Sequence, residues 1–295
     1  MNIVIEPGTY VAAVSGGVDS MVLLNLLAAK PRLKLTVAHY DHGIREESKN
    51  DRLFVQEVAH QLRLPFIYAE GNLGKAASEA KARSARYKFL HSIRSSAGAK
   101  AIVTAHHQDD AMETAIINLL RGSGRKGLTA LKNQEVIIRP LLDWPKHVIL
   151  SYARHKGINW REDPTNQDTK YLRNHVRHNI LANFSTTQKR QLLQHLEKLA
   201  RLNNEIDTAL VNQLHMQPVV KSMDRHWFVM LPHAQALELM ATLLRSQNIP
   251  GFDKKLLEKL VTGAKILKPY KKMDVNNNHI INIGKENLTL ARRDQ

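Results

Sequence analysis

The sequence predicts an α/β fold, a doubly wound parallel sheet, followed by a second, smaller and mainly helical C-terminal domain. Its 295 residues are enough for two domains of ordinary size, each with a substantial core. The first half alternates short apolar runs with longer segments of helical periodicity, as βα units do. Beyond Asp143 this alternation stops and helical patterns dominate. We therefore expect a first domain at residues 1–183 and a second at residues 184–295.

The strands of the first domain are predicted from short runs rich in β-forming apolar residues. These runs are Tyr10–Val14, Leu35–Tyr40, Pro65–Ala69, Ala101–Ala105 and Val136–Ile138. The segments between them are long enough for right-handed helical crossovers. The predicted helices are Val18–Ala29, a helix around Asp51–Leu62, Ala76–Ser95 and Ala111–Leu120. In the common strand order 3-2-1-4-5, the first and fourth strands are neighbours at the switch point of the sheet.

The second half of the chain is predicted to be mainly helical. Pro145 is suited to open a helix that runs to about His155, and a loop with Asp163–Asn166 leads to a basic helix near Tyr171–Ile180. Ser185–Leu214 begins with capping residues and repeats apolar residues at helical spacing, which predicts one long amphipathic helix. The remaining expected elements are helices near Ala234–Ser246 and Lys254–Thr262, and strands near Trp227–Met230 and His279–Ile283.

The composition indicates a polyanionic partner. Lys and Arg total 43 against 27 acidic residues, which gives a formal net charge of +16 and a pI near 10.0. Such an excess favours nucleic acid as the partner. No apolar run approaches the length of a membrane-spanning helix, and the first residues show no secretory signal. The sequence has no cysteine, which excludes disulfides and thiolate metal ligands. We expect a cytoplasmic protein.

Residues Ser15–Ser20 (Ser-Gly-Gly-Val-Asp-Ser) are predicted to form an anion-binding turn between the first strand and the first helix. The two glycines let the backbone approach a ligand closely, and the first helical amides favour negative charge. The two serine hydroxyls add donors, whereas Asp19 would repel a bare phosphate and so suggests a bound cation. The loop lacks the Gly-Lys-Ser/Thr ending of a Walker loop. An ordinary βα turn capped by Ser and Asp is the alternative.

A second group of polar residues, His106–Thr114, follows the fourth predicted strand. In the expected strand order this group lies on one side of the Ser15–Ser20 loop, and the end of the second strand lies on the other side. That strand end carries His39, Asp41, His42 and Arg45. One crevice at the carboxyl ends of the strands would then contain phosphate donors, carboxylates and imidazoles, as a nucleotide site does.

Asp110 and Glu113 are three residues apart at a helix start, so their side chains share a face. Two adjacent carboxylates are suited to bind an ammonium group or a metal ion, but the same spacing is typical of a capping box. On another predicted helix, Arg83 and Arg86 share a face, and Arg83 is also spaced to pair with Glu79.

Three basic segments have two interpretations each. Arg121–Gly127 is either a flexible basic loop or a helix C-cap with surface charges. Arg173 and Arg177 are one helical turn apart and project together, either to contact phosphates or as a solvated helix face. The four lysines within Lys265–Lys272 leave the same choice open.

Taken together, these motifs resemble those of the ATP-pyrophosphatase (PP-loop) superfamily, whose members cleave ATP between its α and β phosphates to adenylate a substrate. Within it, the chain is similar to the tRNA(Ile)-lysidine synthetase family. The similar segments are His39–Arg45, Ala82–Tyr87, His106–Thr114, Arg121–Gly124, Ile138–Leu141, Glu162–Asn166 and Arg173–His178. The resemblance implies an adenine nucleotide α-hydrolase-like catalytic domain and, less specifically, a basic tRNA-binding domain after it. Longer family members carry a further C-terminal domain, and we expect this chain to end before it.

The resemblance implies a two-step reaction on a tRNA(Ile) with a CAU anticodon. O2 of the wobble cytidine attacks the α-phosphate of ATP and expels pyrophosphate. The ε-amine of free L-lysine then attacks C2 and expels AMP, which leaves lysidine in the anticodon. The residues implied to contact ATP are Ser15, Gly16, Gly17, Val18, Asp19, Ser20 and His39. Mg2+ is implied at Asp19, and a homodimer is a further expectation.

The family also implies which residues take lysine and tRNA. Asp110 and Glu113 would bind the ammonium groups of lysine, and Arg83 would bind its carboxylate. Together with Asp19, these three residues are the implied catalytic set. Arg173 and Arg177 are the residues expected to contact tRNA phosphates.

Other functions stay open at the level of sequence. Another PP-loop tRNA-modifying enzyme would share the loop and the substrate, although the lack of cysteine excludes thiolases that use persulfides or an iron–sulfur cluster. A metal-dependent hydrolase would leave the Ser15–Ser20 loop without a role. Its ligands would come from His39, Asp41, His42, His106, His107, Asp109 and Asp110. A nucleic-acid-binding module without catalytic activity is a third alternative.

Overall fold

The computed structural model describes residues 1–41, 43, 48–71, 79–162, 168–215, 222–249 and 251–293. It divides into two compact units, Met1–Leu199 and Ala200–Gln295. The division falls within the long helix α8 (Thr186–His215), whereas the sequence analysis placed a boundary before this helix. Each unit contains a hydrophobic core of its own.

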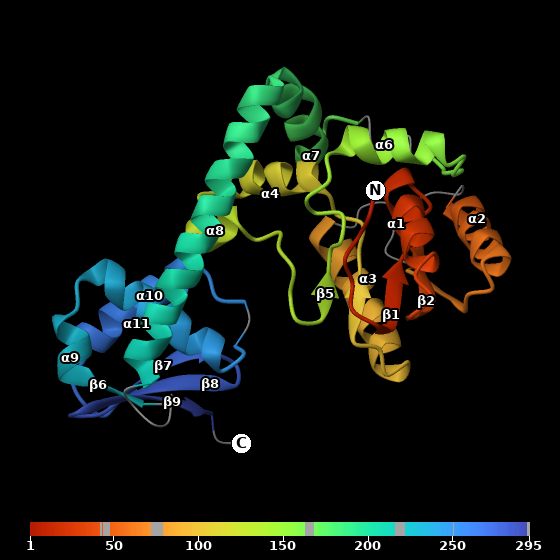
Figure 1. The fold of residues 1–295 in the computed structure, drawn as a ribbon. Helices are drawn as coiled ribbons and strands as arrows, with labels where there is room; N and C mark the ends of the chain where they lie inside the picture. Colours follow the sequence, from red (N-terminus) through yellow and green to blue (C-terminus); the bar gives the residue numbers. More distant parts are fainter. Residues whose placement is uncertain are drawn as a thin grey trace. The chain divides into compact units, whose positions relative to one another are not determined.

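The first unit is built on a parallel five-stranded sheet in the order β3-β2-β1-β4-β5, as the sequence predicted (Figure 1). The strands are β1 (Gly8–Ala13), β2 (Leu33–Asp41), β3 (Phe66–Glu70), β4 (Ala101–Val103) and β5 (Ile137–Ile138). β1 is the central strand, and its Ala12 pairs with Val37 on one side and Val103 on the other. The segments that follow β1, β2 and β4 therefore start at the same edge of the sheet.

Helices cover both faces of this sheet. The helices of the first unit are α1 (Val18–Ala28), α2 (Ser48–Gln61), α3 (Glu79–Ser96), α4 (Gln108–Leu120), α5 (Arg125–Leu128), α6 (Lys146–His155) and α7 (Leu172–His175), which continues as a π-helical turn (Val176–Ile180) and a 3-10 turn (Leu181–Asn183). Alternate side chains of β1 point to opposite faces. Tyr10 and Ala12 join a core cluster with residues of α1, α2 and α6, whereas Val11 joins a cluster with residues of α3.

α4 begins at Gln108 rather than at the predicted Ala111. Its Met112 and Ile117 pack with Val176 and Leu181 in a separate apolar cluster. This packing fixes the π-helical turn beside α4, and it places the basic side chains of that turn near the acidic side chains of the helix.

The second unit contains a four-stranded antiparallel sheet as well as helices. Its elements after α8 are β6 (Ser222–Asp224), α9 (Arg225–Met230), α10 (His233–Ser246), α11 (Lys254–Ile266), β7 (Lys271–Asn276), β8 (His279–Ile283) and β9 (Asn287–Arg292). The strand order is β6-β9-β8-β7. The predicted strand at His279–Ile283 is confirmed, but the one at Trp227–Met230 is wrong. The Asp224 carboxylate accepts the backbone N–H of Trp227 at 2.6 Å and so caps a helix there.

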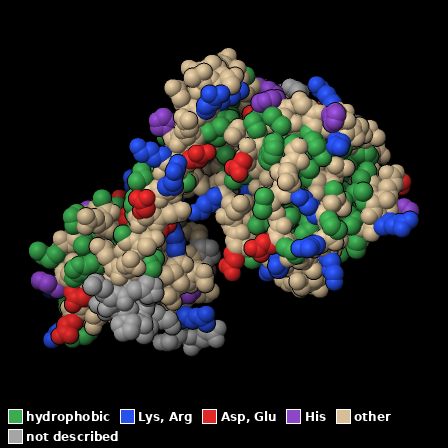
Figure 2. All heavy atoms as spheres, viewed as in Figure 1, with side chains coloured by type: hydrophobic (Ala, Val, Ile, Leu, Met, Phe, Trp, Pro, Cys, Tyr) green, Lys and Arg blue, Asp and Glu red, His purple; other side chains and the backbone are tan. Residues whose placement is uncertain are grey.

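The described residues expose many basic side chains, as the excess of Lys and Arg in the composition predicts (Figure 2). Lys and Arg side chains are spread over the visible face of each unit and do not gather in one patch (Figure 2). Within the described ranges, no helix combines the length and the apolar character needed to cross a membrane.

Candidate functional site

The Ser15–Ser20 loop joins β1 to α1, and hydrogen bonds to a single hydroxyl fix its backbone. Ser20 Oγ donates to Gly17 O at 2.8 Å and accepts from the N–H groups of Ser15 and Gly16, both at 3.2 Å. Gly16 has a φ of +94°, which a residue with a Cβ rarely adopts. Gly17 is the N-cap of α1; its own N–H donates to Ser15 Oγ at 3.4 Å, but no N-cap side chain accepts from the N–H groups of the first helical turn. The first turn of α1 is therefore available for an anion.

His39 supports this loop from β2. Its Nδ1 is 2.9 Å from the carbonyl oxygen of Val14, the residue before the loop. In the tautomer that carries its proton on Nδ1, the ring donates a hydrogen bond to this oxygen. Burial lowers the pKa of His39, and this effect outweighs the opposite influence of the bond to Val14. The ring is therefore neutral at neutral pH, and it holds the end of β1 in place.

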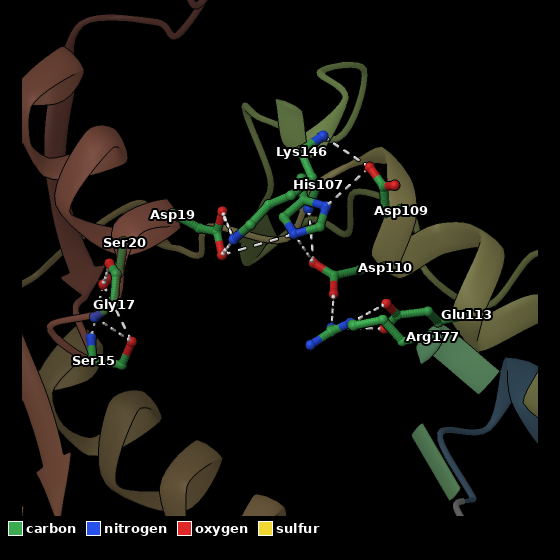
Figure 3. A network of polar contacts seen from close by, with 10 residues as sticks. All are labelled: Ser15, Gly17, Asp19, Ser20, His107, Asp109, Asp110, Glu113, Lys146 and Arg177. Atoms are coloured by element: carbon green, nitrogen blue, oxygen red, sulfur yellow. Dashed lines mark hydrogen bonds and ion pairs between the residues drawn. The ribbon is translucent and has the colours of Figure 1, made fainter. Parts of the chain in front are cut away.

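Asp19, in the first turn of α1, pairs with a lysine that the sequence analysis did not single out. Lys146 Nζ is 2.7 Å from each carboxylate oxygen of Asp19 (Figure 3). Lys146 is the first residue of α6, and its backbone N–H donates to the carboxylate of Asp109 at 2.8 Å. Asp109, from α4, thus caps α6 and fixes the backbone of Lys146 beside the loop.

His107 lies between the carboxylates of Asp19 and Asp110. Its Nε2 is 3.7 Å from Asp19 Oδ2 and 3.5 Å from Asp110 Oδ2. The backbone N–H of His107 donates to Asp110 at 3.0 Å, so Asp110 also caps α4, but the capping box pairs His107 with Asp110 and not Asp110 with Glu113 as the alternative had it. Burial would raise the pKa of Asp110, but His107, His106 and the donated backbone N–H together hold this pKa below its ordinary value.

Glu113 lies one turn further along α4 and is only 1% exposed. It forms a two-point ion pair with Arg177 of the π-helical turn, with Nε 2.6 Å from Oε1 and Nη2 3.0 Å from Oε2. Arg177 Nη2 is also 3.7 Å from Asp110 Oδ1. Burial raises the pKa of Glu113 even though Arg177 favours its ionised form. Asp110 and Glu113 therefore do share a face, and an internal cation already contacts both.

Arg83 lies on α3 with an exposed side chain, and its guanidinium carbon is 4.9 Å from the centroid of the Tyr87 ring. No ion pair or hydrogen bond between the described residues joins Arg83 to Asp110 or Glu113. Arg86, on the same helix, contacts the same ring at 5.4 Å. The structure thus places Arg83 within a group of basic side chains and not beside the carboxylate pair.

That basic group includes Arg86 and Arg139, which the sequence analysis did not assign to the site, and Arg173, which it assigned to tRNA phosphates. Arg86, Arg139 and Arg173 each bury an Nε atom that has no hydrogen-bond partner within the described part of the chain. Arg173 Nη2 donates to Thr114 Oγ1 at 3.3 Å. Burial, with smaller contributions from nearby arginines, lowers the pKa of His106 to about 3 against the opposite influence of Asp110. His106 is therefore neutral at neutral pH.

Some predicted site residues lie outside the described residues. They are His42, Arg45 and Asp163–Asn166, together with the expected first residues of the helix at Ala76–Ser95. The described residues contain no group of three or more His, Asp or Glu side chains arranged to hold a metal ion. The metal-dependent hydrolase alternative therefore finds no site among them. A single carboxylate such as Asp19 still suits Mg2+, which keeps several water ligands and takes others from phosphate.

The polar groups form one continuous network of polar contacts (Figure 3). It contains, in spatial order, Lys146, Asp19, His107, Asp110, Arg177 and Glu113. One end of the network lies at the anion-binding turn, and the other end lies at the carboxylate pair of α4. The arrangement offers one site for a polyphosphate and a neighbouring site for a cation.

Comparison with known proteins agrees with this geometry. A family model described as "PP-loop domain" matches residues 5–184. A tRNA(Ile)-lysidine synthase of Thermotoga sp. is 41% identical over 189 residues, which cover 60% of this chain and 45% of that protein. One from Lactiplantibacillus plantarum is 32% identical over 279 residues, which cover 88% of this chain and 62% of that protein. The chain thus spans less than two thirds of the length of either relative.

A solved structure supports the fold. The U34-tRNA thiolase NcsA from Methanococcus maripaludis, with its [4Fe-4S] cluster, superposes with a TM-score of 0.54 at 17% identity, covering 66% of this chain and 73% of that one. At this level of identity, the likeness concerns the arrangement of strands and helices alone.

Proposed function

Because the chain belongs to the PP-loop domain family, we propose that it is an ATP-dependent ligase that attaches lysine to C2 of the wobble cytidine in a CAU-anticodon tRNA(Ile). The observation that carries the proposal is the polar network that joins the Ser15–Ser20 turn to the Asp110–Glu113 pair. The two ends provide what a two-step reaction needs, an activation site for ATP and a site for a substrate ammonium group. Relatives named tRNA(Ile)-lysidine synthase support the same assignment.

In the first step, the cytidine O2 attacks the α-phosphorus of ATP and pyrophosphate leaves. We assign ATP binding to the Ser15–Ser20 loop, whose unbonded first-turn amides favour phosphate. His39 contributes by holding Val14 in place. Mg2+ at Asp19 would neutralise phosphate charge as pyrophosphate departs. A second carboxylate, Asp110, is connected to Asp19 through His107.

In the second step, the ε-amine of lysine attacks C2 of the adenylated cytidine, and AMP leaves with the bonding electron pair. We assign the ammonium groups of lysine to Asp110 and Glu113, and its carboxylate to Arg83. The attacking amine must lose a proton. Glu113 is a better acceptor than Asp110, because burial raises the pKa of Glu113 whereas the pKa of Asp110 is lowered.

We assign tRNA contacts to Arg173, Arg177 and the basic residues of a tRNA-binding domain at 184–295. The net charge of +16 supports this assignment, because neutralising backbone phosphates dominates affinity for nucleic acid. Arg177 would exchange its partner Glu113 for a phosphate when tRNA arrives.

The direct test supplies ATP, Mg2+, labelled lysine and a transcript of tRNA(Ile) with a CAU anticodon. We expect label in the tRNA, with one AMP released for each lysine attached. A matched transcript with uridine at the wobble position should take up no label. Release of AMP without any dependence on lysine would favour another PP-loop tRNA-modifying enzyme. The absence of both AMP and label would overturn the proposal.

A further inference from the structure

The turn that is expected to bind an anion itself contains a negatively charged residue, Asp19. Asp19 lies in the first turn of α1, two residues after the N-cap Gly17, so it brings a negative charge to the turn where a polyphosphate would bind. Two like charges at close range repel each other, and the repulsion grows as water is excluded. The sequence Ser15–Ser20 contains no lysine that could offset this charge. A protein cation that assists here, in addition to Mg2+, must therefore come from elsewhere in the chain.

The structure brings such a cation from a distant part of the sequence. Lys146 Nζ is 2.7 Å from both carboxylate oxygens of Asp19. Its backbone is fixed, because Asp109 caps the start of α6 and the buried side chains of Ile149 and Ala153 pack α6 onto the core. Its side chain is not fixed in the same way, since it is 34% exposed and ends a flexible four-carbon stem. The ammonium group can therefore change partners while α6 stays in place.

A purely structural role explains this pair poorly. Asp19 is 27% exposed, and ion pairs that reach solvent contribute little to stability. The pair nevertheless lies next to the amides of the first turn of α1 and within 3.7 Å of His107, at one end of the polar network. An ammonium group there is well placed for an incoming anion.

We propose that Lys146 is the lysine that binds the β- and γ-phosphates of ATP, supplied by α6 because the loop lacks one. Asp19 holds its ammonium group in the free protein, and the phosphates take it over when ATP binds. When the bond between the α-phosphorus and its bridging oxygen breaks, pyrophosphate keeps the electron pair. Lys146 stabilises the added charge by donating hydrogen bonds and transfers no proton. The inference rests on the proposed function only in that the loop must bind ATP.

Equilibrium binding measurements test this role without relying on turnover. We expect Lys146→Ala to weaken binding of ATP with Mg2+ at least tenfold and to leave AMP binding nearly unchanged, because AMP lacks the β- and γ-phosphates. Lys146→Arg should retain part of the ATP affinity. Lys156→Ala, at the exposed other end of α6, is the matched control and should bind ATP as the wild type does. Thermal unfolding midpoints will establish that each variant is folded.

A double variant separates phosphate binding from simple neutralisation of Asp19. If Lys146 contacts phosphate, Asp19→Asn will not restore ATP affinity to Lys146→Ala. Restoration, or equal ATP affinity of Lys146→Ala and the wild type, would overturn the inference alone. Failure of the wild type to bind ATP would overturn the inference together with the proposed function.

Discussion

Arg177 binds Glu113 through two parallel contacts along one edge of its guanidinium, with Nε 2.6 Å from Oε1 and Nη2 3.0 Å from Oε2. One residue of the basic segment that we assign to tRNA is therefore paired with one residue that we assign to lysine. The pair has consequences for stability and for substrate binding that can be measured separately.

Removal of Arg177 should destabilise the protein. Breaking a fully buried ion pair costs roughly 3–5 kcal/mol, and we expect about 2 kcal/mol for Arg177→Ala because Arg177 is 34% exposed. Urea unfolding at pH 7 measures this loss. Glu113 has a raised pKa, so the native state takes up its proton before the unfolded state does, and the loss should shrink on acidification. The double variant with Glu113→Gln should recover most of the stability, and no recovery would contradict the pairing.

Substitution of the carboxylate pair should affect lysine more than ATP. Asp110→Asn keeps an acceptor for the backbone N–H of His107, so α4 should remain capped while the charge is lost. We expect Asp110→Asn and Glu113→Gln each to raise the KM for lysine at least tenfold and to leave ATP binding within about twofold, because each removes a carboxylate charge that attracts an ammonium group. The exposed Glu135→Gln is the control. An unchanged lysine KM in folded variants would refute the assignment.

His106 should make the protein sensitive to acid. Its pKa is about 3 in the folded protein because of burial, below its ordinary value of 6.5. Between these values the unfolded chain binds a proton that the native state does not, so the free energy of unfolding falls as the pH is lowered. We expect His106→Gln to reduce this slope by up to about 1.4 kcal/mol per pH unit relative to the wild type. The exposed His60→Gln should leave the slope unchanged, and a slope equal in all three proteins would contradict this prediction.

The two glycines of the turn should respond differently to alanine. Gly16 has a φ of +94°, so Gly16→Ala should cost about 1–3 kcal/mol of stability and weaken ATP binding. Gly17 has a φ of −73°, and a Cβ there meets only Ser15 Oγ at 3.6 Å. The free energy of unfolding of Gly17→Ala should therefore lie within about 0.5 kcal/mol of the wild-type value. Chemical denaturation of both variants measures this difference. Equal losses of stability in the two variants would contradict the prediction.

Binding of tRNA should weaken with salt if the basic residues contact phosphates. Removing one phosphate contact lowers the slope of log affinity against log salt by about 0.9 for a duplex and about 0.7 for a single strand. We expect Lys271→Ala and Lys272→Ala, at exposed positions of β7, to reduce the slope, and the exposed Lys156→Ala to leave it unchanged. Filter binding across a salt series measures it, and a flat response of the wild type would remove phosphate contact as the source of affinity.

Most of the fold could be predicted from local sequence patterns. The strands of the first unit could be predicted because each is a short apolar run bounded by polar residues, and their order followed from a common topology. β7 and β9 were missed because their exposed positions are polar, so that only alternate residues such as Met273, Val275 and Leu288 reveal the buried face. At Trp227–Met230, aromatic and β-branched residues favoured a strand, but capping by Asp224 decided for a helix.

The site could be predicted only where the residues that form it lie close together in the sequence. This holds for the Ser15–Ser20 turn and for the Asp110–Glu113 pair. Lys146 does not, because its partner Asp19 is 127 residues away and nothing beside it in the sequence distinguishes it from a surface lysine. Arg177 could be singled out as basic, but its pairing with Glu113 depends on how α4 packs against the π-helical turn.

The three hydrogen bonds of Ser20 Oγ have a consequence for binding kinetics. They give the turn its shape in the absence of any ligand, so the backbone is already ordered when a nucleotide arrives. The conformational entropy of these residues is lost once, when the chain folds, and not again at each encounter. A preorganised cradle of this kind should capture phosphate at a rate set by diffusion and charge, without waiting for a loop to close.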